Sequence, residues 1–245
     1  TLAPTPTVAR DLEARGFSPV EVWGRGVDLD QFDPDRRRQA RRDDWDVGER
    51  LAVGFVGRLA AEKRVDRLAA LAARPDLRLV IVGDGPERAN LEAAMPEAHF
   101  TGMLAGADLG EAMASLDLFV HTGEHETFCQ TIQEAMASGV PVVAPAAGGP
   151  VDLVTPGVNG ELFRPGDDAD LLATVEALAA DPERRRRLAA AGMASVQERT
   201  WSSVSGRLVV HYRRAIAAHQ PLILAPAASS GRSAAAEDRH RGAAA

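Results

Sequence analysis

Short apolar runs alternate with longer amphipathic stretches between residues 51 and 163. A run that is apolar throughout predicts a strand buried on both faces, because a strand with one solvated face alternates between apolar and polar positions. Leu51–Val56 is a run of this kind, and shorter or less regular apolar runs predict further strands at Leu77–Val82, Ala98–Thr101, Leu116–His121, Pro141–Ala144 and Gly160–Phe163.

The stretches between these strands, and those that follow the last one, carry apolar residues at helical spacing. They predict helices from Pro86 onward and at Glu62–Ala73, Leu109–Ala114, Gln130–Ser138, Ala169–Ala180, Pro182–Glu198 and Ser202–His219. Strands that alternate with helices predict an α/β fold with a doubly wound parallel sheet, which is Rossmann-like. Ligands of such sheets bind at the carboxyl ends of the strands.

The two ends of the chain differ from the central region, which we expect to form one domain over residues 51–200. Residues 1–50 contain helical and extended fragments but no domain-sized pattern. Residues 201–220 predict a helix with an apolar stripe. Residues 221–245 are mostly Ala, Ser, Gly and Arg, a composition that predicts disorder.

The composition narrows the class of protein. The net charge of −7 argues against a nucleic-acid partner, and the arginine runs at 36–42 and 184–187 read as solvated faces. Cys129 is the one cysteine, which excludes an internal disulfide and is consistent with a reducing compartment. No apolar run approaches membrane-spanning length, and no signal-peptide pattern opens the sequence. We therefore expect a cytoplasmic protein, whose contact with a membrane, if any, is peripheral.

Lys63 is the one lysine among 28 basic residues, and its position indicates a chemical role. It lies five residues after Arg58, on a turn that begins at Gly57, follows the first predicted strand and opens a helix. A guanidinium offers a planar fork and an ammonium a compact charge, so the two on this turn can bind a phosphate group. The alternative is a pair of solvated cations, although cations oppose the dipole at a helix N-terminus.

Glu126 and Glu134 flank the start of the helix predicted at residues 130–138. A helix N-terminus suits a phosphate, so carboxylates on either side of it suit the hydroxyls of a sugar and of a ribose. Helical spacing over this interval would separate them by about 12 Å, more than the ~5–9.5 Å of paired hydrolytic carboxylates. They are therefore interpreted as two separate binding groups. A pair of solvated surface glutamates is the remaining alternative.

Residues 121–144 resemble the Glu-x7-Glu signature of retaining glycosyltransferases of family 4, often called group 1, which have the two-domain GT-B architecture. Residues 26–34, with Gly-Val-Asp followed by Phe-Asp-Pro, are similar to the family's crossover between the two domains. The resemblance implies that this chain is the C-terminal half of a GT-B fold. Residues 1–50 would be a remnant of the N-terminal domain with the crossover, and residues 201–220 the helix that crosses back.

The resemblance also implies roles for individual residues. Glu126 would hold the hydroxyls of the donor sugar and Glu134 those of the ribose, while Arg58 and Lys63 stabilise the leaving diphosphate without a metal. The catalytic residues implied are Arg58, Lys63 and Glu126. The donor-binding residues implied are Gly57, Arg58, Lys63, Gly83, Met103, Leu104, Glu126, Phe128, Cys129, Gln130 and Glu134.

Within the family, residues 126–135 most resemble bacterial GDP-mannose-dependent α-mannosyltransferases that act on lipid or small glycoside acceptors. We therefore expect retaining transfer of mannose from GDP-mannose, with no cofactor and with peripheral membrane contact made through the N-terminal domain. The commonest family pattern has glycine where this chain has Cys129. The difference needs only a modest backbone change if that position avoids positive φ.

Several alternatives stand beside this hypothesis. Without an acceptor domain, the chain could be a nucleotide-sugar-binding module that catalyses nothing. A sugar-nucleotide epimerase would need a further acid–base pair, which the sequence does not supply. Residues 83–88 read G-x-G-x-x-R and depart from the dinucleotide fingerprint. His121, His125 and Cys129 have the spacing of zinc ligands on a helix, but His121 closes a strand, so the three should not share a helical face.

Overall fold

The computed structural model describes residues 1–219, so the tail predicted at 221–245 lies outside the described residues. The chain divides into two compact units, Thr1–Leu208 and Val209–Ala245. Helix α10 (Trp201–His219) begins in the first unit and ends in the second. The first unit contains the sheet and the cavities described below.

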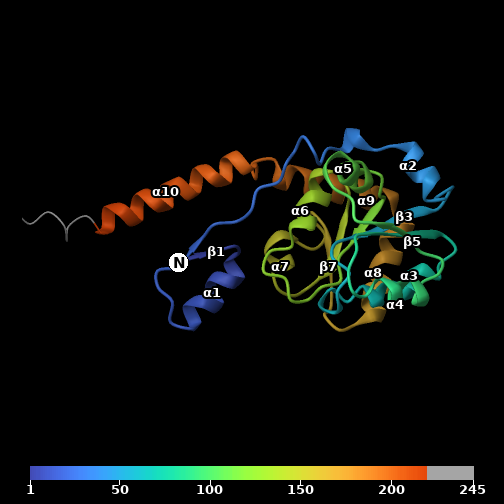
Figure 1. Ribbon diagram of the computed structural model, residues 1–245, viewed down its shortest axis with the longest axis horizontal. Helices are drawn as coiled ribbons and strands as arrows, with labels where there is room; N and C mark the ends of the chain where they lie inside the picture. The colour runs from blue at the N-terminus through green and yellow to red at the C-terminus, as the bar shows by residue number, and fades with distance from the viewer. Residues whose placement is uncertain (220–245) are drawn as a thin grey trace, which may run out of the picture. The chain divides into compact units, whose positions relative to one another are not determined.

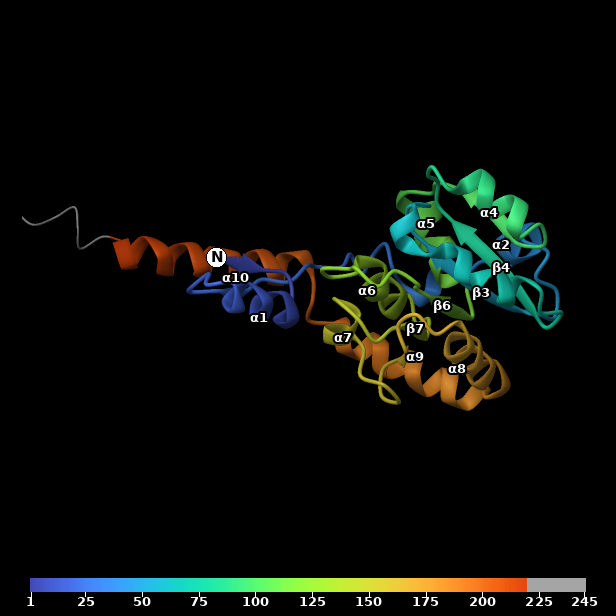
Figure 2. The same cartoon turned by 90° about the horizontal axis from the view of Figure 1, so that it is seen from below.

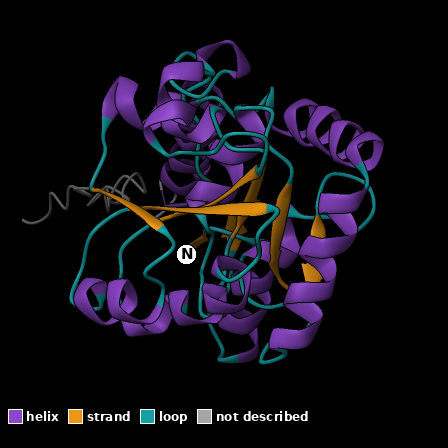
Figure 3. Ribbon diagram, turned by 90° about the vertical axis from the view of Figure 1, so that its right-hand side faces the viewer, coloured by secondary structure: helices purple, strands orange, loops and turns teal. Residues whose placement is uncertain are grey.

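A six-stranded parallel sheet forms the centre of the first unit, with helices around it (Figure 3). Its strands are β3 (Leu51–Val56), β4 (Leu77–Val82), β5 (His99–Gly102), β6 (Leu118–Val120), β7 (Val142–Pro145) and β8 (Glu161–Phe163). They are arranged in the order β5-β4-β3-β6-β7-β8, so the winding of the chain reverses between β3 and β6. This order confirms the predicted doubly wound α/β fold, and such a reversal is where these sheets bind ligands.

Helices cover both faces of the sheet, with α5 and α6 on one face and α3, α4 and α8 on the other (Figures 1 and 2). These helices and the following α9 have the bounds α3 (Ala69–Ala72), α4 (Arg88–Ala94), α5 (Gly106–Ala114), α6 (Gln130–Ala137), α8 (Asp168–Ala180) and α9 (Pro182–Val196). Strand β3 shows why both faces are filled. Ala52 and Val56 pack in one core, and Val53 and Phe55 pack in the other, because alternate side chains of a strand point to opposite faces.

Residues 1–50 form small elements of their own. These elements are β1 (Leu2–Ala3), α1 (Pro6–Ala14), β2 (Glu21–Val22) and α2 (Gln39–Asp44), and β1 pairs with β2 in a parallel two-stranded sheet. The indole Nε1 of Trp23 donates a hydrogen bond of 3.0 Å to Val204 O in α10. A Cβ on Gly26 would lie 2.5 Å from the backbone of Trp201. The start of α10 therefore packs directly against the N-terminal segment.

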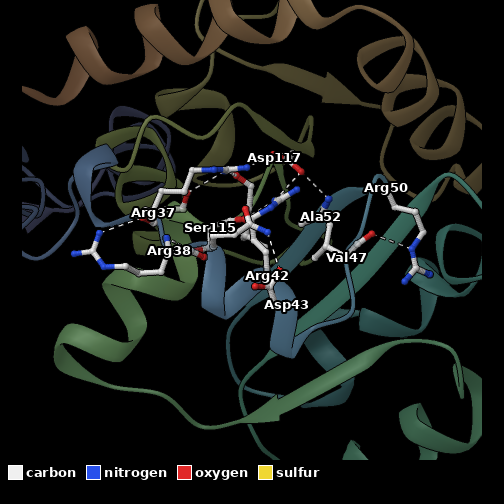
Figure 4. Close-up of polar contacts among 12 residues, drawn as sticks. Arg37, Arg38, Arg42, Asp43, Val47, Arg50, Ala52, Ser115 and Asp117 are labelled. Carbon is white, nitrogen blue, oxygen red and sulfur yellow. Dashed lines mark hydrogen bonds and ion pairs between the residues drawn. The ribbon is translucent and has the colours of Figure 1, made fainter.

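The arginine run at residues 36–42 is a solvated face only in part (Figure 4): Arg37 and Arg38 are exposed as expected, whereas the side chains of Arg41 and Arg42 are mostly buried in ion pairs. Asp117 accepts hydrogen bonds from Arg37 Nη2 at 2.7 Å and from Arg42 Nη1 at 2.9 Å. It also accepts one of 2.8 Å from the backbone N of Ala52 in β3. Because Asp117 lies just before β6, this carboxylate connects the run to both central strands of the sheet.

The segment predicted as one helix at Glu62–Ala73 is interrupted. It contains 3₁₀ turns at Ala61–Lys63 and Val65–Leu68, followed by the single turn of α3. The interruption occurs at Arg64, whose φ of 51° is left-handed and cannot continue a right-handed helix. As a result, Lys63 lies in an irregular turn and not along a helix axis.

Two smaller differences concern short helices. Helix α4 begins at Arg88, two residues later than the predicted start at Pro86. Helix α7 (Pro150–Leu153) was not predicted, because four residues are too few to show a helical period. Within the described residues, no helix combines the length and the apolar character that a membrane crossing requires.

Candidate active site

The turns after β3 and β4 lie in close contact at the carboxyl edge of the sheet. Gly57 N donates a hydrogen bond of 3.0 Å to Val82 O, the last residue of β4. A Cβ on Gly83 would lie 1.9 Å from Gly57 O, so this position requires glycine. The contact fixes the start of the turn that carries Arg58 and Lys63.

Lys63 and Glu126 come together across the point where the sheet reverses. The Nζ atom of Lys63 lies 2.5 Å from Oε1 of Glu126, and both side chains are mostly buried. The hydroxyl of Thr122 donates a hydrogen bond of 2.6 Å to Lys63 O, which connects the turn after β3 to the loop after β6. Cation and carboxylate are therefore placed by the ends of two adjacent strands.

The loop that carries Glu126 is held from behind by residues that follow β7. Gly149 N donates a hydrogen bond of 2.6 Å to Glu126 O. A Cβ on Gly149 would lie 2.6 Å from the backbone of Phe128, and one on Gly148 would lie 2.5 Å from Glu126 O. This close backbone packing needs glycine at both positions and fixes the path of residues 126–128.

Cys129 precedes helix α6 with a φ of 70° and a ψ of 75°, in the left-handed region. The sequence predicts only a modest backbone change at this position, provided that its φ is not positive. The structure does not meet this condition, because the φ of Cys129 is positive. A non-glycine residue in this region is strained by contact between its Cβ and the backbone. The structure holds Cys129 there because the preceding Phe128 is buried in the core and Gln130 begins the helix.

His121 follows β6 and is the third polar group of the cluster, with Lys63 and Glu126. Its side chain is 3% exposed, and its Nε2 atom lies 3.1 Å from Oε1 of Glu126. Its ring is stacked against that of Phe55, with centroids 6.0 Å apart and an angle of 13° between the planes. Oε1 of Glu126 thus contacts both Lys63 and His121.

The electrostatics of the cluster keep Glu126 ionised. Burial by itself would raise the pKa of Glu126, but His121 and Lys63 outweigh it and lower this pKa to about 2. Burial likewise opposes the charged imidazolium, but Cys129 and Glu126 together raise the pKa of His121 to about 9. Both shifts favour an ion pair between His121 and Glu126, beside the ammonium of Lys63.

Two cavities adjoin this cluster and share Val56, Gly57, Arg58 and Thr131 in their walls. The smaller one, of about 310 Å³, contains Lys63, His121 and Glu126. The larger one, of about 660 Å³, contains Glu134 and apolar side chains. Their volumes and their common wall suit an elongated ligand with one charged part and one flat, less polar part.

Glu134 is the ionisable group of the larger cavity whose pKa departs most from its ordinary value. Burial raises the pKa of Glu134 to about 7, and the neighbouring Gln130 offsets only part of this effect. Glu126 and Glu134 therefore lie in different cavities and in opposite electrostatic surroundings.

The residues predicted to bind a donor all line one of the two cavities. Lys63 and Glu126 are brought into contact, whereas Arg58 forms an ion pair with Glu62. The smaller cavity includes Gly57, Arg58, Lys63, Glu126, Phe128, Cys129 and Gln130. The larger cavity includes Gly57, Arg58, Gly83, Met103, Leu104 and Glu134.

The sequence reasoning missed His121 as a member of the site, as well as Arg25, Thr127 and Thr131 in the walls. The position of His121, directly after a strand beside the point of reversal, is a signal that could have identified it. The zinc arrangement considered for His121 does not form. Within residues 1–219, no group of three or more His, Cys, Asp or Glu side chains could hold a metal ion.

Comparison with known proteins places this geometry in a family. The model of the family "Glycosyl transferases group 1" matches residues 37–194. A GDP-mannose-dependent alpha-mannosyltransferase of Mycolicibacterium smegmatis is 54% identical over 213 residues, which cover 86% of this chain and 56% of that protein. A protein of the same name from Corynebacterium glutamicum is 47% identical over 225 residues, which cover 91% and 54% of the two chains. This chain thus spans about half the length of these relatives.

A solved structure agrees with the sequence comparison. The crystal structure of Anabaena HepE in complex with UDP-glucose is similar with a TM-score of 0.78 and 26% identity, over 87% of this chain and 63% of HepE. The fold is therefore that of the C-terminal, Rossmann-like half of a GT-B enzyme, as predicted. Since the family model matches more than half of the chain and these relatives cover 86% and 91% of it, the chain belongs to the group 1 glycosyltransferases.

Proposed function

We propose that this chain forms the donor-binding half of a retaining mannosyltransferase that transfers mannose from GDP-mannose to a lipid or small glycoside acceptor. The names of its relatives, GDP-mannose-dependent alpha-mannosyltransferases, support the donor. The single observation that carries the proposal is the contact of Lys63 with Glu126 in a cavity that adjoins a second, larger one. The smaller cavity would take the mannose and the diphosphate, and the larger one the nucleoside.

Each site residue has a role in this proposal. The Lys63 ammonium stabilises the charge that grows on the leaving diphosphate, and Arg58 joins it by exchanging Glu62 for a phosphate oxygen. Glu126 accepts hydrogen bonds from mannose hydroxyls, and Glu134 accepts them from the ribose. Backbone amides at the start of α6 face the phosphate.

The bond between the anomeric carbon of mannose and the phosphate oxygen breaks, and the acceptor oxygen bonds to the same face of that carbon. A phosphate oxygen takes the proton of the acceptor hydroxyl. Because fixed cations supply the positive charge, the proposal includes no metal. We place the reaction in the cytoplasm, at the inner face of a membrane when the acceptor is a lipid.

Replacement of Lys63 by alanine in the full-length protein tests this mechanism. We expect transfer from GDP-mannose to fall by about 10²–10³, as for the loss of one oxyanion donor. The control is Arg64→Ala, which removes an exposed cation one residue further along the chain. Normal turnover in the Lys63 variant would exclude the proposed role of Lys63.

A second candidate function is a nucleotide-sugar-binding module without catalysis. The observation in its favour is that the chain spans about half of its relatives, while the resemblance implies an acceptor site in the other half. Calorimetry of this chain with GDP and GDP-mannose, combined with a transfer assay, separates the two functions. Binding without transfer supports the module, and the absence of binding to either nucleotide contradicts both candidates.

A further inference from the structure

Glu126 and Cys129 both act on the imidazole of His121, and the contact with Glu126 shows which nitrogen faces the carboxylate. Its Nε2 atom faces Oε1 of Glu126 at 3.1 Å, while its Nδ1 atom is buried with no hydrogen-bond partner among the described residues. The stacked ring of Phe55 limits rotation of the imidazole. Both the neutral Nε2–H tautomer and the imidazolium place a proton on the nitrogen that faces Glu126. A carboxylate opposite Nε2 favours these two forms over the neutral Nδ1–H tautomer, and in both of them His121 donates to Glu126.

Lys63 has two competing anionic partners in the proposed reaction. In the structure its Nζ lies against Oε1 of Glu126. A diphosphate that enters the same cavity carries two negative charges, one more than the carboxylate, and attracts the ammonium more strongly. When Lys63 turns to the diphosphate, Glu126 loses its closer cation. A largely buried carboxylate that lacks a partner is costly, and it would turn away or take up a proton.

We propose that His121 is a positioning residue that keeps Glu126 ionised and aimed at the donor sugar after the diphosphate has drawn Lys63 away. This inference rests on the proposed function, since it concerns how the site distinguishes a sugar nucleotide from a nucleotide. His121 acts only through Glu126 and affects binding of the sugar. Binding of the nucleotide depends on Lys63, Arg58 and the larger cavity.

The backbone leaves room for this pair. A Cβ on Gly123 would lie 2.9 Å from Oε1 of Glu126 and 3.0 Å from Nε2 of His121. The first distance is shorter than real Cβ contacts and the second is at their lower limit, so an alanine would displace the carboxylate and crowd the imidazole. Gly123→Ala therefore disturbs the same hydrogen bond without changing either side chain that forms it.

The test compares the dissociation constants of GDP and GDP-mannose, measured by isothermal titration calorimetry on this chain. His121→Leu removes the donor, and His121→Gln retains an N–H group that can reach the carboxylate. His125→Leu is the matched control, because His125 is an exposed histidine on the same loop. The ratio of the two dissociation constants in each variant is divided by the wild-type ratio, which cancels any general loss of affinity.

We expect His121→Leu to weaken GDP-mannose relative to GDP by about tenfold, the effect of losing one hydrogen bond to a charged group. His121→Gln should lose less than His121→Leu, Gly123→Ala should resemble His121→Leu, and His125→Leu should not change the ratio. If the leucine variant does not fold, the glutamine and Gly123 variants still decide the question.

Equal losses for both ligands would indicate a purely structural role and overturn the proposal. So would an unchanged ratio in the leucine or Gly123 variant, or a loss in His121→Gln as large as in His121→Leu. If the wild-type chain binds neither ligand, the proposed function fails, and this inference fails with it. If it binds both and only the variants behave otherwise than expected, the inference alone fails.

Discussion

The raised pKa of Glu134 predicts that donor affinity depends on pH near neutrality. The carboxyl is neutral in the folded protein up to a pKa of about 7, because burial disfavours its charged form. In the proposed function it accepts hydrogen bonds from ribose hydroxyls, and an ionised carboxylate does this best. Binding of GDP-mannose should therefore favour the ionised form and release a proton.

The size of the effect follows from the ionised fraction. With a pKa of about 7, about 9% of the sites are ionised at pH 6 and about 91% at pH 8, so affinity should improve by about tenfold over this interval. At pH 7 the release should be about half a proton per donor bound. The phosphates of GDP-mannose are diesters, which stay fully ionised throughout this range.

Calorimetry at pH 6, 7 and 8, in two buffers with different ionisation enthalpies, measures both the affinity and the proton release. Glu134→Gln should remove the dependence, whereas Glu183→Gln, at a side chain that is 90% exposed, should retain it. A wild-type affinity that is constant from pH 6 to pH 8 would refute the reasoning. Proton release that persists in Glu134→Gln would refute it as well.

The raised pKa of Glu134 also affects the free energy of unfolding. Donor affinity should rise with pH, whereas stability should fall with pH. Since the folded pKa lies above the ordinary value of 4.5, the folded state binds more protons than the unfolded state between these values. Stability from this group is therefore complete below about pH 4.5 and is lost progressively as the pH rises to about 7. The loss is about 3 kcal/mol. Urea denaturation should show that Glu134→Gln gains stability relative to wild type at pH 8 but not at pH 4.

Three further predictions concern the framework of the site. Cys129→Gly should raise the unfolding free energy by about 1 kcal/mol, because glycine adopts a φ of 70° without strain; a loss of stability in urea denaturation would contradict the strain. Asp117→Ala should cost about 3 kcal/mol by the same measurement, because Arg42 and Ala52 N lose a buried acceptor; unchanged stability would exclude a structural role for the carboxylate. Gly83→Ala should abolish GDP binding, because the added Cβ would lie 1.9 Å from the backbone oxygen of Gly57. Gly206→Ala is the control, because its added Cβ would have no atom within 4 Å, and it should bind GDP normally. Titration with GDP measures both, and normal binding by Gly83→Ala would contradict the prediction.

The sheet was predictable because its central strands are buried on both faces. Strands β3 and β4 lie at the predicted bounds, Leu51–Val56 and Leu77–Val82. Their sequences leave few alternatives, since Leu51–Val56 contains no polar residue and Leu77–Val82 contains only Arg78, and such runs between turns favour a strand in the middle of a parallel sheet.

The conformation of the site was less predictable, because it depends on residues outside regular elements. The break at Arg64 depends on a left-handed residue that helical periodicity does not indicate. The path of residues 126–128, which leads into the left-handed Cys129, depends on close packing of Gly148 against Glu126 and of Gly149 against Phe128. Residue types could be read from the motif, but the partners of those residues could not.

The contact between Lys63 and Glu126 explains why a chain rich in arginine has lysine at this position. Oε1 of Glu126 faces Nζ of Lys63 at 2.5 Å and Nε2 of His121 at 3.1 Å, so one oxygen serves two donors. A guanidinium is planar and binds best to two acceptor atoms at once, whereas an ammonium is a compact charge that can approach a single oxygen and leave it for another. Arg58 illustrates the difference, since it remains at the rim of both cavities in a pair with Glu62. The proposed exchange of a carboxylate for a diphosphate therefore favours the geometry of lysine over that of arginine at position 63.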